Sequence, residues 1–342
     1  MFRRLDQQDL LVTAGPGSVV SRVSLREFAD VSAIRWCGCQ QQLIATAAPQ
    51  GARVPDVHAG ERGDLRLFRC DPQNGLWQQL YRGYAHDPVC LSGGRYAVHR
   101  GAGLTLLDQH GVVMREVKVG RFNWGPPALS VGPDGATVAW IHRTGDRSTL
   151  CVAGVGPGAL TQFRTSAYRY AWLDAGTLVY LFGARPRLLD VSSGATRPFG
   201  TGLRAHVRRG SVIGATDQLQ ALAELAAAQL WEIYGEIQVV GADVWFTATV
   251  TEQCGPRRVD GLFRTDAAGE TLHLVATMAP DDRVDGFLAL PDRSVHLFLA
   301  TYAGTTVVDR RRAAAGPMRD FLSAGWSPML TGRQAVFGVH WL

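Results

Sequence analysis

The segment that decides the fold reads Ala128-Leu-Ser-Val-Gly-Pro-Asp-Gly-Ala-Thr-Val-Ala-Trp140. Its centre, Pro133-Asp134-Gly135, has the residue types of a tight turn, and the alternating residues from Thr137 to Ile141 predict a strand after it. Similar units recur along the chain, and the best-preserved turn glycines, Gly94, Gly135 and Gly176, are 41 residues apart. The seven units centre on Cys39-Gln40, Gly93-Gly94, Asp134-Gly135, Ala175-Gly176, Gly241-Ala242, Pro291-Asp292 and Thr331-Gly332.

Each unit is followed by a second pair of candidate strands. After Trp140, for example, residues 148–155 and 159–164 alternate between apolar and polar types. Four short strands in a repeat of roughly 40 residues are typical of one blade of a β-propeller. An α/β barrel would need a helical pattern after every strand, and that pattern is missing almost everywhere.

The two ends of the chain complement each other. The last turn is followed by one candidate strand, residues 335–341, while residues 10–13 and 18–25 form an unmatched pair before the first full unit. Pairing these segments would remove two exposed sheet edges. We therefore predict an all-β, seven-bladed β-propeller with a composite closing blade, as one domain over residues 1–342, with six or eight blades as alternatives.

The quoted segment also resembles a known superfamily. The residues Val131-Gly-Pro-Asp-Gly-Ala-Thr-Val-Ala-Trp140 are similar to the apolar-x-Pro-Asp-Gly-x-x-apolar-Ala phrase of TolB-like and WD-repeat-like propellers. The phrase is degraded in the other units, and no Gly-His to Trp-Asp pairing recurs. The resemblance implies the fold alone, because this superfamily includes binding scaffolds, peptidase gates and enzymes.

One segment interrupts the strand pattern. Residues 216–234 are rich in alanine and carry leucines at helical spacing, with Thr216 or Asp217 placed to cap a helix. We expect an inserted helix that braces two blades, with a lid or a docking helix as the alternative. Residues 207–215 could instead form a strand pair, which would allow an eighth blade.

Composition limits the possible locations and partners. The chain has no stretch of 18 apolar residues and no apolar run at its amino terminus. We therefore expect a cytoplasmic protein without a membrane partner. Of 35 basic residues only Lys118 is lysine, which is typical of a GC-rich, bacterial genome. Because the arginine clusters lack interleaved aromatic residues, we expect no nucleic-acid partner.

The cysteines do not form a recognisable framework. Six are scattered along the chain, and we expect reduced thiols in the core. Cys37 and Cys39 would share one face of a strand, but no third metal ligand lies near them in the sequence. There is no Gly-x-Ser-x-Gly elbow and no His-Glu-x-x-His motif. We therefore predict no metal and no cofactor.

Polar and aromatic residues gather just before the repeated turns, where the loop entering each innermost strand would form one rim of a propeller. This predicted rim contains Arg35, Trp36, Tyr84, His86, Asp87, Asn123, Trp124, Tyr168, Arg169, Tyr170, Arg283, Asp285 and Trp326. One interpretation is packing between blades, with the arginines paired to neighbouring groups. The other is a ligand pocket with aromatic walls.

Two functions follow from the second interpretation. The first is a binding module that holds a small molecule, a peptide or a protein at this rim. The alternative is a cofactor-independent lyase, cyclase or hydrolase, with His86 as general acid or base and Arg169 and Tyr170 as further catalytic residues. A carboxylate such as Asp285 could orient His86. Adjacent residues on a strand face opposite sides, so Asp87 is not expected to do so.

Overall fold

The computed structural model of this chain is almost entirely β-structure. The described residues form strands β1 to β28 and one short 3-10 helix, η1 (Ser92–Gly94). None of its described helical segments is long and apolar enough to span a membrane. The structure describes residues 2–4, 9–15, 18–53, 63–100, 103–119, 129–144, 147–156, 160–165, 167–182, 185–199, 231–251, 258–268, 272–277, 283–289, 293, 295–301, 304–310, 327–330 and 334–336.

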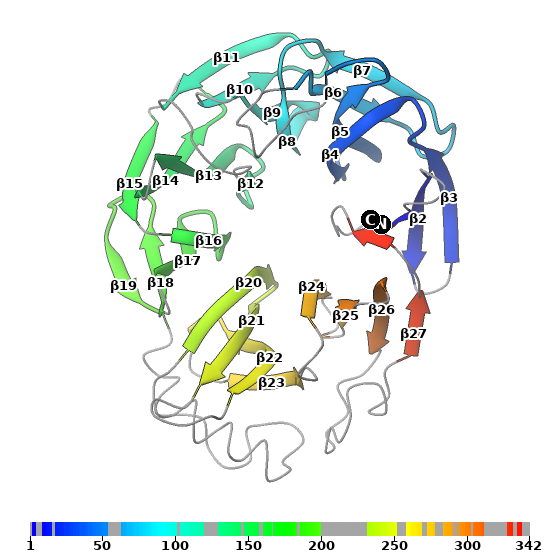
Figure 1. Cartoon of the computed structure of the whole chain (residues 1–342). Coiled ribbons are helices and arrows are strands. Elements are labelled where there is room, and N and C mark those ends of the chain that lie inside the picture. The colour runs from blue at the N-terminus through cyan, green and yellow to red at the C-terminus, as the bar shows by residue number, and fades with distance from the viewer. Residues whose placement is uncertain are drawn as a thin grey trace. The chain divides into compact units, whose positions relative to one another are not determined.

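The chain divides into two compact units, Met1–Ser166 with Gln334–Leu342, and Ala167–Arg333. In the first unit, every sheet has four antiparallel strands, shown in blue to green in Figure 1 except for the red strand β28. The strands, in spatial order, are β28 (Gln334–Val336), β1 (Phe2–Arg4), β2 (Asp9–Gly15) and β3 (Ser18–Ser24); β4 (Phe28–Cys37), β5 (Gln42–Pro49), β6 (Arg66–Cys70) and β7 (Trp77–Tyr81); β8 (His86–Cys90), β9 (Tyr96–His99), β10 (Gly103–Leu107) and β11 (Val113–Lys118); and β12 (Ser130–Val131), β13 (Thr137–Thr144), β14 (Arg147–Gly154) and β15 (Thr161–Thr165).

The second unit repeats this pattern in green to orange-red. Its sheets are again four-stranded and antiparallel, and each follows the order of the sequence. The strands are β16 (Ala167–Trp172), β17 (Thr177–Phe182), β18 (Arg185–Asp190) and β19 (Thr196–Pro198); β20 (Trp231–Val240), β21 (Asp243–Thr251), β22 (Arg258–Asp266) and β23 (Leu272–Thr277); and β24 (Arg283–Ala289), β25 (Val295–Thr301), β26 (Gly304–Arg310) and β27 (Ser327–Leu330).

Alternation along the strands explains how successive sheets of the first unit pack. On β4, Ile34 lies in a buried cluster with Leu10 and Val23 of the preceding sheet. Cys37 instead lies in a cluster with Tyr96 and other residues of the following sheet. The two clusters occupy opposite faces of the β4–β7 sheet, so its neighbours cover both faces. Face-to-face stacking of four-stranded sheets is the packing of propeller blades.

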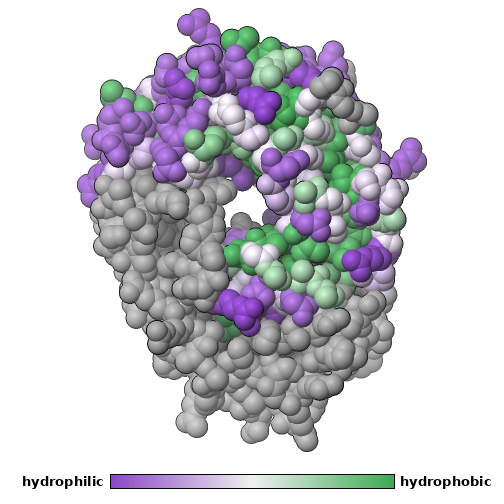
Figure 2. Space-filling view, turned by 180° about the vertical axis from the view of Figure 1, so that it is seen from behind, coloured by the Kyte–Doolittle hydropathy of each residue, from purple (hydrophilic) through white to green (hydrophobic). Residues whose placement is uncertain are grey.

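Burial falls toward the last strand in the sheets that end with β11, β15 and β19. The second strand β5 is buried over most of its length, whereas β11, β15 and β19 are largely exposed. The face shown in Figure 2 carries mostly hydrophilic residues along the outer margin of its coloured part.

The decisive turn forms as its residues predict. The Asp134 carboxylate accepts hydrogen bonds from the backbone N–H groups of Ala136 and Thr137, both at 2.9 Å, and from the Thr137 hydroxyl at 2.6 Å. Gly135 adopts a positive φ of 65°, a conformation that glycine reaches without steric cost. The Gly135 carbonyl then accepts a hydrogen bond from Ser92 N–H at 2.8 Å. The turn therefore also ties its sheet to the preceding one.

In the second unit, sheets are joined through polar side chains. Gln238 on β20 donates to the Phe287 carbonyl and accepts from Ala289 N–H at 3.1 Å, and both partners lie on β24. Asp243 at the start of β21 pairs with Arg264 at 3.6 Å and with Arg293 at 2.9 Å. The Gln238 contacts and the Asp243–Arg293 pair link the β20–β23 sheet to the β24–β27 sheet, whereas the Asp243–Arg264 pair lies within the first of these sheets.

The structure corrects two predictions about elements. The helix expected over residues 216–234 is wrong at its end, because residues 231–234 belong to β20, while residues 216–230 and 207–215 lie outside the described part. The strands on either side of Thr331-Gly332 do not pair with each other. β27 pairs with β26, and β28 pairs with β1. The sheet formed by β28, β1, β2 and β3 therefore takes one strand rather than two from the carboxyl-terminal segment.

Candidate functional site

The innermost strands β4 and β8 run side by side in the first unit and are joined at successive levels. The Ser32 hydroxyl lies 2.9 Å from His86 Nε2, and the Arg35 guanidinium lies 2.6 Å from the Asp87 carboxylate. The contacts between the two strands follow in order along them: Ser32 contacts His86, Arg35 contacts Asp87, and Cys37 contacts Cys90. The structure thus brings together Arg35 and Asp87, two residues of the predicted rim, and places His86 beside Ser32.

Asp87 is a structural anchor rather than a ligand-binding group. Its carboxylate is buried, accepts hydrogen bonds from Arg35, and also accepts one from the Leu129 N–H just before β12. One carboxylate therefore connects three successive sheets. Its backbone φ of 47° is in the left-handed region, which Asp tolerates better than most residues. Because Arg35 is engaged with Asp87, this contact matches the packing interpretation of that arginine.

His86 occupies a partly enclosed position with one polar partner. Burial lowers the pKa of its imidazole below the ordinary value of 6.5, and the nearby Asp87 and Asp30 charges oppose that effect. The ring is therefore neutral near neutral pH. Its Nδ1 atom has no hydrogen-bond partner among the described residues. As expected, Asp87 does not orient this ring, and Ser32 is the partner that the sequence analysis missed.

A groove of about 420 Å³ opens at the end of the β8–β11 sheet where β8 begins. Its walls come from the segment before β8, the end of β9, the start of β10 and the end of β11, with the lining residues Tyr84, Arg100, Gly103, Leu104, Thr105, Glu116, Val117 and Lys118. Leu104 and Val117 give it an apolar floor. A volume of this size is in the range that holds a small molecule.

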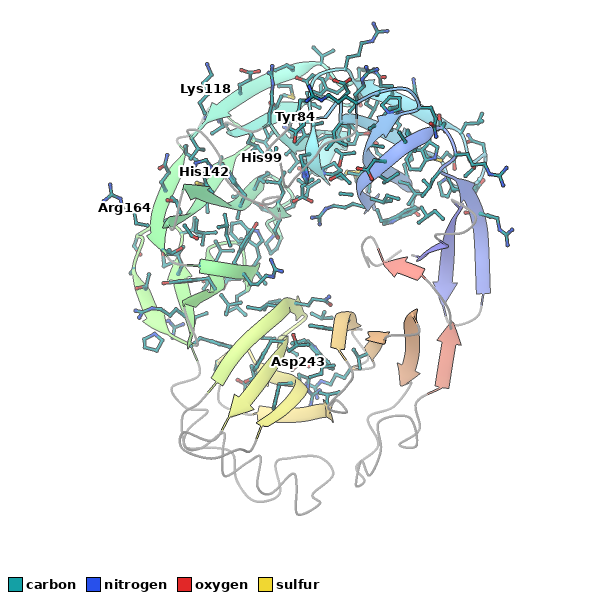
Figure 3. All side chains as sticks on the ribbon, in the orientation of Figure 1. Tyr84, His99, Lys118, His142, Arg164 and Asp243 are labelled. Atoms are coloured by element: carbon teal, nitrogen blue, oxygen red, sulfur yellow. A yellow bond between two sulfur atoms is a disulfide. The ribbon has the colours of Figure 1, made fainter. Side chains whose placement is uncertain are left out.

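The groove is lined by more positively charged side chains than negatively charged ones. Arg100 and Glu116 form an ion pair across it, with both side chains about half exposed. Lys118 is exposed and adds a positive charge, and Tyr84 adds a half-buried aromatic ring; Figure 3 labels Tyr84 and Lys118 on their separate segments. The groove therefore has a net positive charge beside an aromatic wall. The exposure of Lys118 agrees with the alternation at the end of β11, where Val117 is buried and Glu116 and Lys118 are exposed.

Three of the other predicted site residues have described side chains. Trp36 packs against the cluster between the first two sheets of its unit, which matches the packing interpretation. In the second unit, Arg169 is exposed on β16 and Tyr170 is buried on the same strand. Tyr168 lies on β16, and Arg283 and Asp285 lie on β24. Asn123, Trp124 and Trp326 lie outside the described residues. Convergence of the whole set on one rim remains a prediction.

The cysteine prediction needs correction. Cys37 and Cys90 form a disulfide, and Cys39 is exposed rather than in the core, while Cys70 and Cys151 are buried free thiols as expected. Cys254 lies outside the described residues. The two bonded residues are 53 positions apart in sequence, but side-by-side strands place their Cα atoms 5.3 Å apart. That separation suits a disulfide and cannot be read from cysteine spacing.

Comparison with known proteins supports the fold. The chain matches the β-propeller domain of the Trilobed protease from Pyrococcus furiosus with a TM-score of 0.56 at 10% identity, over 91% of this chain and 86% of that one. It matches Porphyromonas gingivalis dipeptidyl peptidase 4 with a TM-score of 0.52 at 12% identity, over 90% of this chain. For a putative 6-phosphogluconolactonase from Bacteroides fragilis the TM-score is 0.50 at 14% identity, over 91% and 94% of the two chains.

The fold is that of a β-propeller. This confirms the all-β architecture and the resemblance to β-propellers at the level of the fold, and identities this low carry nothing about activity. The chain spans 49% of the dipeptidyl peptidase chain and 29% of a tricorn protease chain that it also matches. No protein-family model matches the sequence, and no curated protein matches it.

Proposed function

We propose that this chain is a seven-bladed β-propeller that acts as a cytoplasmic binding module. The four-stranded sheets of the two units and the pairing of β28 with β1 support seven blades and a closing blade built from both ends of the chain. The ligand is a small molecule with an acidic group, held in the groove beside Tyr84. Neither nucleic acid nor a membrane is part of this proposal.

The groove at the start of β8 is the observation that carries the proposal. It combines an open volume of about 420 Å³, an apolar floor and one aromatic ring. Because Arg100 is already paired with Glu116, the Lys118 ammonium is, among the described residues that line this groove, the charge available to an incoming anion. Sites of this kind use apolar walls for affinity and a few polar groups for orientation.

Lys118 allows a selective test because it is the only lysine of the chain. Reductive methylation with isotope-labelled formaldehyde tags Lys118 and the amino terminus and keeps both charges. We expect phenyl phosphate and benzoate to shift the Lys118 methyl resonance saturably, whereas benzyl alcohol at equal concentration does not. The variant Tyr84→Ala should weaken binding about tenfold, which is the value of one aromatic contact.

Arg164→Gln is the matched control, because Arg164 is an exposed cation on β15, in another sheet. It should leave the titration unchanged. A Lys118 resonance that ignores both acids, or that responds equally to benzyl alcohol, would refute the proposed groove.

A second candidate function is hydrolysis at Ser32. A neutral, partly buried imidazole whose Nε2 lies 2.9 Å from a serine hydroxyl is the pairing of a general base with a nucleophile. The test is covalent labelling by a fluorophosphonate probe. Labelling of Ser32 that is abolished by His86→Ala would support an enzyme, and an unlabelled Ser32 would leave the pair with a structural role.

A further inference from the structure

Three cysteines meet where β4 and β8 end. Cys37 is the last residue of β4, Cys39 follows it in the turn, and Cys90 is the last residue of β8. Cys39 Sγ lies 3.4 Å from Cys37 Sγ and 3.1 Å from Cys90 Sγ. All three sulfur atoms lie within 4.8 Å of one another. The sequence argument against a metal rested on a missing third ligand, and the neighbouring sheet supplies one.

The cluster is open to solvent on one side only. Cys37 is buried, Cys90 is half-buried, and Cys39 is exposed. The Leu91 carbonyl oxygen lies 3.6 Å from Cys39 Sγ and 3.7 Å from Cys90 Sγ. An ion entering past Cys39 would therefore meet three sulfur atoms, with its remaining position facing water or this carbonyl.

The position of Cys39 distinguishes between two kinds of cysteine chemistry. Thiol–disulfide exchange requires the attacking sulfur to approach along the extension of the S–S bond, close to one sulfur and well away from the other. Cys39 Sγ is instead about equally distant from both. It lies beside the bond, so that the three sulfur atoms face a common point. This is the arrangement of a chelate rather than of an exchange reaction.

We propose that Cys37, Cys39 and Cys90, when reduced, form a three-thiolate site for Zn²⁺. A dithiol reductant supplies the two electrons and two protons that convert the Cys37–Cys90 bond into two thiols. Binding of Zn²⁺ then releases one proton from each of the three thiols, and water completes the coordination. Sulfur-only ligation selects soft and borderline ions over magnesium or calcium.

The dimensions fit zinc. Tetrahedral Zn²⁺ with Zn–S bonds of about 2.3 Å holds its sulfur ligands roughly 3.8 Å apart. The two contacts of Cys39, at 3.1 and 3.4 Å, are already close to that spacing. Cys37 and Cys90 reach it by side-chain rotation after reduction. In a reducing cytoplasm, the compartment proposed above, disulfides are not generally maintained.

The other described cysteines, Cys70 and Cys151, are buried free thiols with raised pKa values. Burial raises the pKa of Cys70 to about 12, and nearby Asp71 and Glu27 add to that effect. Burial likewise raises the pKa of Cys151 to about 12. Both remain protonated thiols at neutral pH, and in the described part of the chain neither joins the cluster. They are therefore controls within the same molecule.

The test is a zinc titration of the phosphine-reduced, chelator-treated protein against a chromophoric chelator. We expect one Zn²⁺ per chain, at least a hundredfold weaker binding in Cys39→Ser, and unchanged binding in Cys151→Ala. Cobalt(II) provides a second measurement, because its thiolate charge-transfer band reports the sulfur ligands directly. Circular dichroism of each reduced protein establishes that the fold is retained.

Two results would overturn the site. The first is a folded, reduced wild-type protein that takes up no zinc from the competing chelator. The second is equal zinc affinity, or an equal cobalt charge-transfer band, in wild type and Cys39→Ser. Since this cluster and the groove use different residues, failure of either proposal leaves the other standing.

Discussion

Asp87 shows how one residue can organise several sheets. Its carboxylate is buried and accepts hydrogen bonds from Arg35 in the preceding sheet and from Leu129 N–H before the following one. Removing one partner of a buried ion pair leaves the other uncompensated, which costs more than the pair itself contributes. The stability of the first unit should therefore depend strongly on this side chain.

We predict that Asp87→Asn destabilises the protein by about 2–4 kcal/mol in urea unfolding. Asparagine is the suitable replacement because it tolerates the φ of 47° at this position. The control is Glu116→Gln, which breaks the half-exposed pair with Arg100 and should cost under about 1 kcal/mol. Equal losses in the two variants would contradict the anchoring role.

His86 predicts a pH dependence of stability. Its folded-state pKa lies below 6.5 because of burial, so the unfolded chain binds the proton more readily. The free energy of unfolding therefore falls as pH drops below about 6.5 and continues to fall toward the lower folded-state pKa. Urea midpoints measured across this range should show a steeper decline in wild type than in His86→Gln. Parallel curves would show that His86 is not buried as a neutral group.

At the scale of elements, close approach between sheets is concentrated at turns. Gly111, between β10 and β11, has a φ of 81°, and a Cβ atom there would overlap the Leu80 carbonyl of β7 in the preceding sheet. Gly51 has a similar φ of 78° but no atom within 4 Å of the Cβ position. The two glycines share a backbone conformation and differ only in their surroundings.

We predict that Gly51→Ala costs about 1–2 kcal/mol through its backbone conformation. Gly111→Ala should cost roughly 2 kcal/mol more, because the two sheets must also move apart. Thermal and urea unfolding of both variants measure this difference. If both substitutions cost the same, the turn of the β8–β11 sheet does not contact β7 as closely as described.

The sequence predicted most of these elements for a clear physical reason. Turn residues such as Asp134 and Gly135 act locally, and the continuous apolar run at residues 138–141 of β13 reflects burial on both faces of a sheet. The end of the expected helix was wrong because residues 231–234 pair with β21, a tertiary effect that helical spacing does not contain. Tertiary context commonly overrides propensity in this way.

The candidate site was less accessible to prediction. Arg35, Tyr84, His86 and Asp87 were found because they precede repeated turns, but the contacts of His86 with Ser32 and of Arg35 with Asp87 depend on the register between neighbouring sheets. Arg100 and Glu116 do not belong to the predicted rim before the repeated turns, because they lie at the ends of β9 and β11. The meeting of Cys37, Cys39 and Cys90 likewise follows from strands that are adjacent in space and distant in sequence.

At the scale of the whole molecule, the pairing of β1 with β28 is the contact between the two ends of the described chain. Arg3 lies opposite Ala335 in this antiparallel pair. Cysteines at these two positions should form a cross-link under mild oxidation and raise the melting temperature by at least about 3 °C. The pair Arg3→Cys with Gln334→Cys is displaced by one residue and should react less. Equal reaction of both pairs would argue against the described register.

The central claim is that this propeller binds a small acidic molecule in the groove beside Tyr84. Its most direct test is native mass spectrometry of the protein enriched gently from its own source cells, comparing wild type with a Tyr84→Ala, Lys118→Met double variant. The claim predicts a small-molecule mass retained by the wild type and absent from the variant. A wild type that retains no such mass, or a variant that retains the same one, would contradict it.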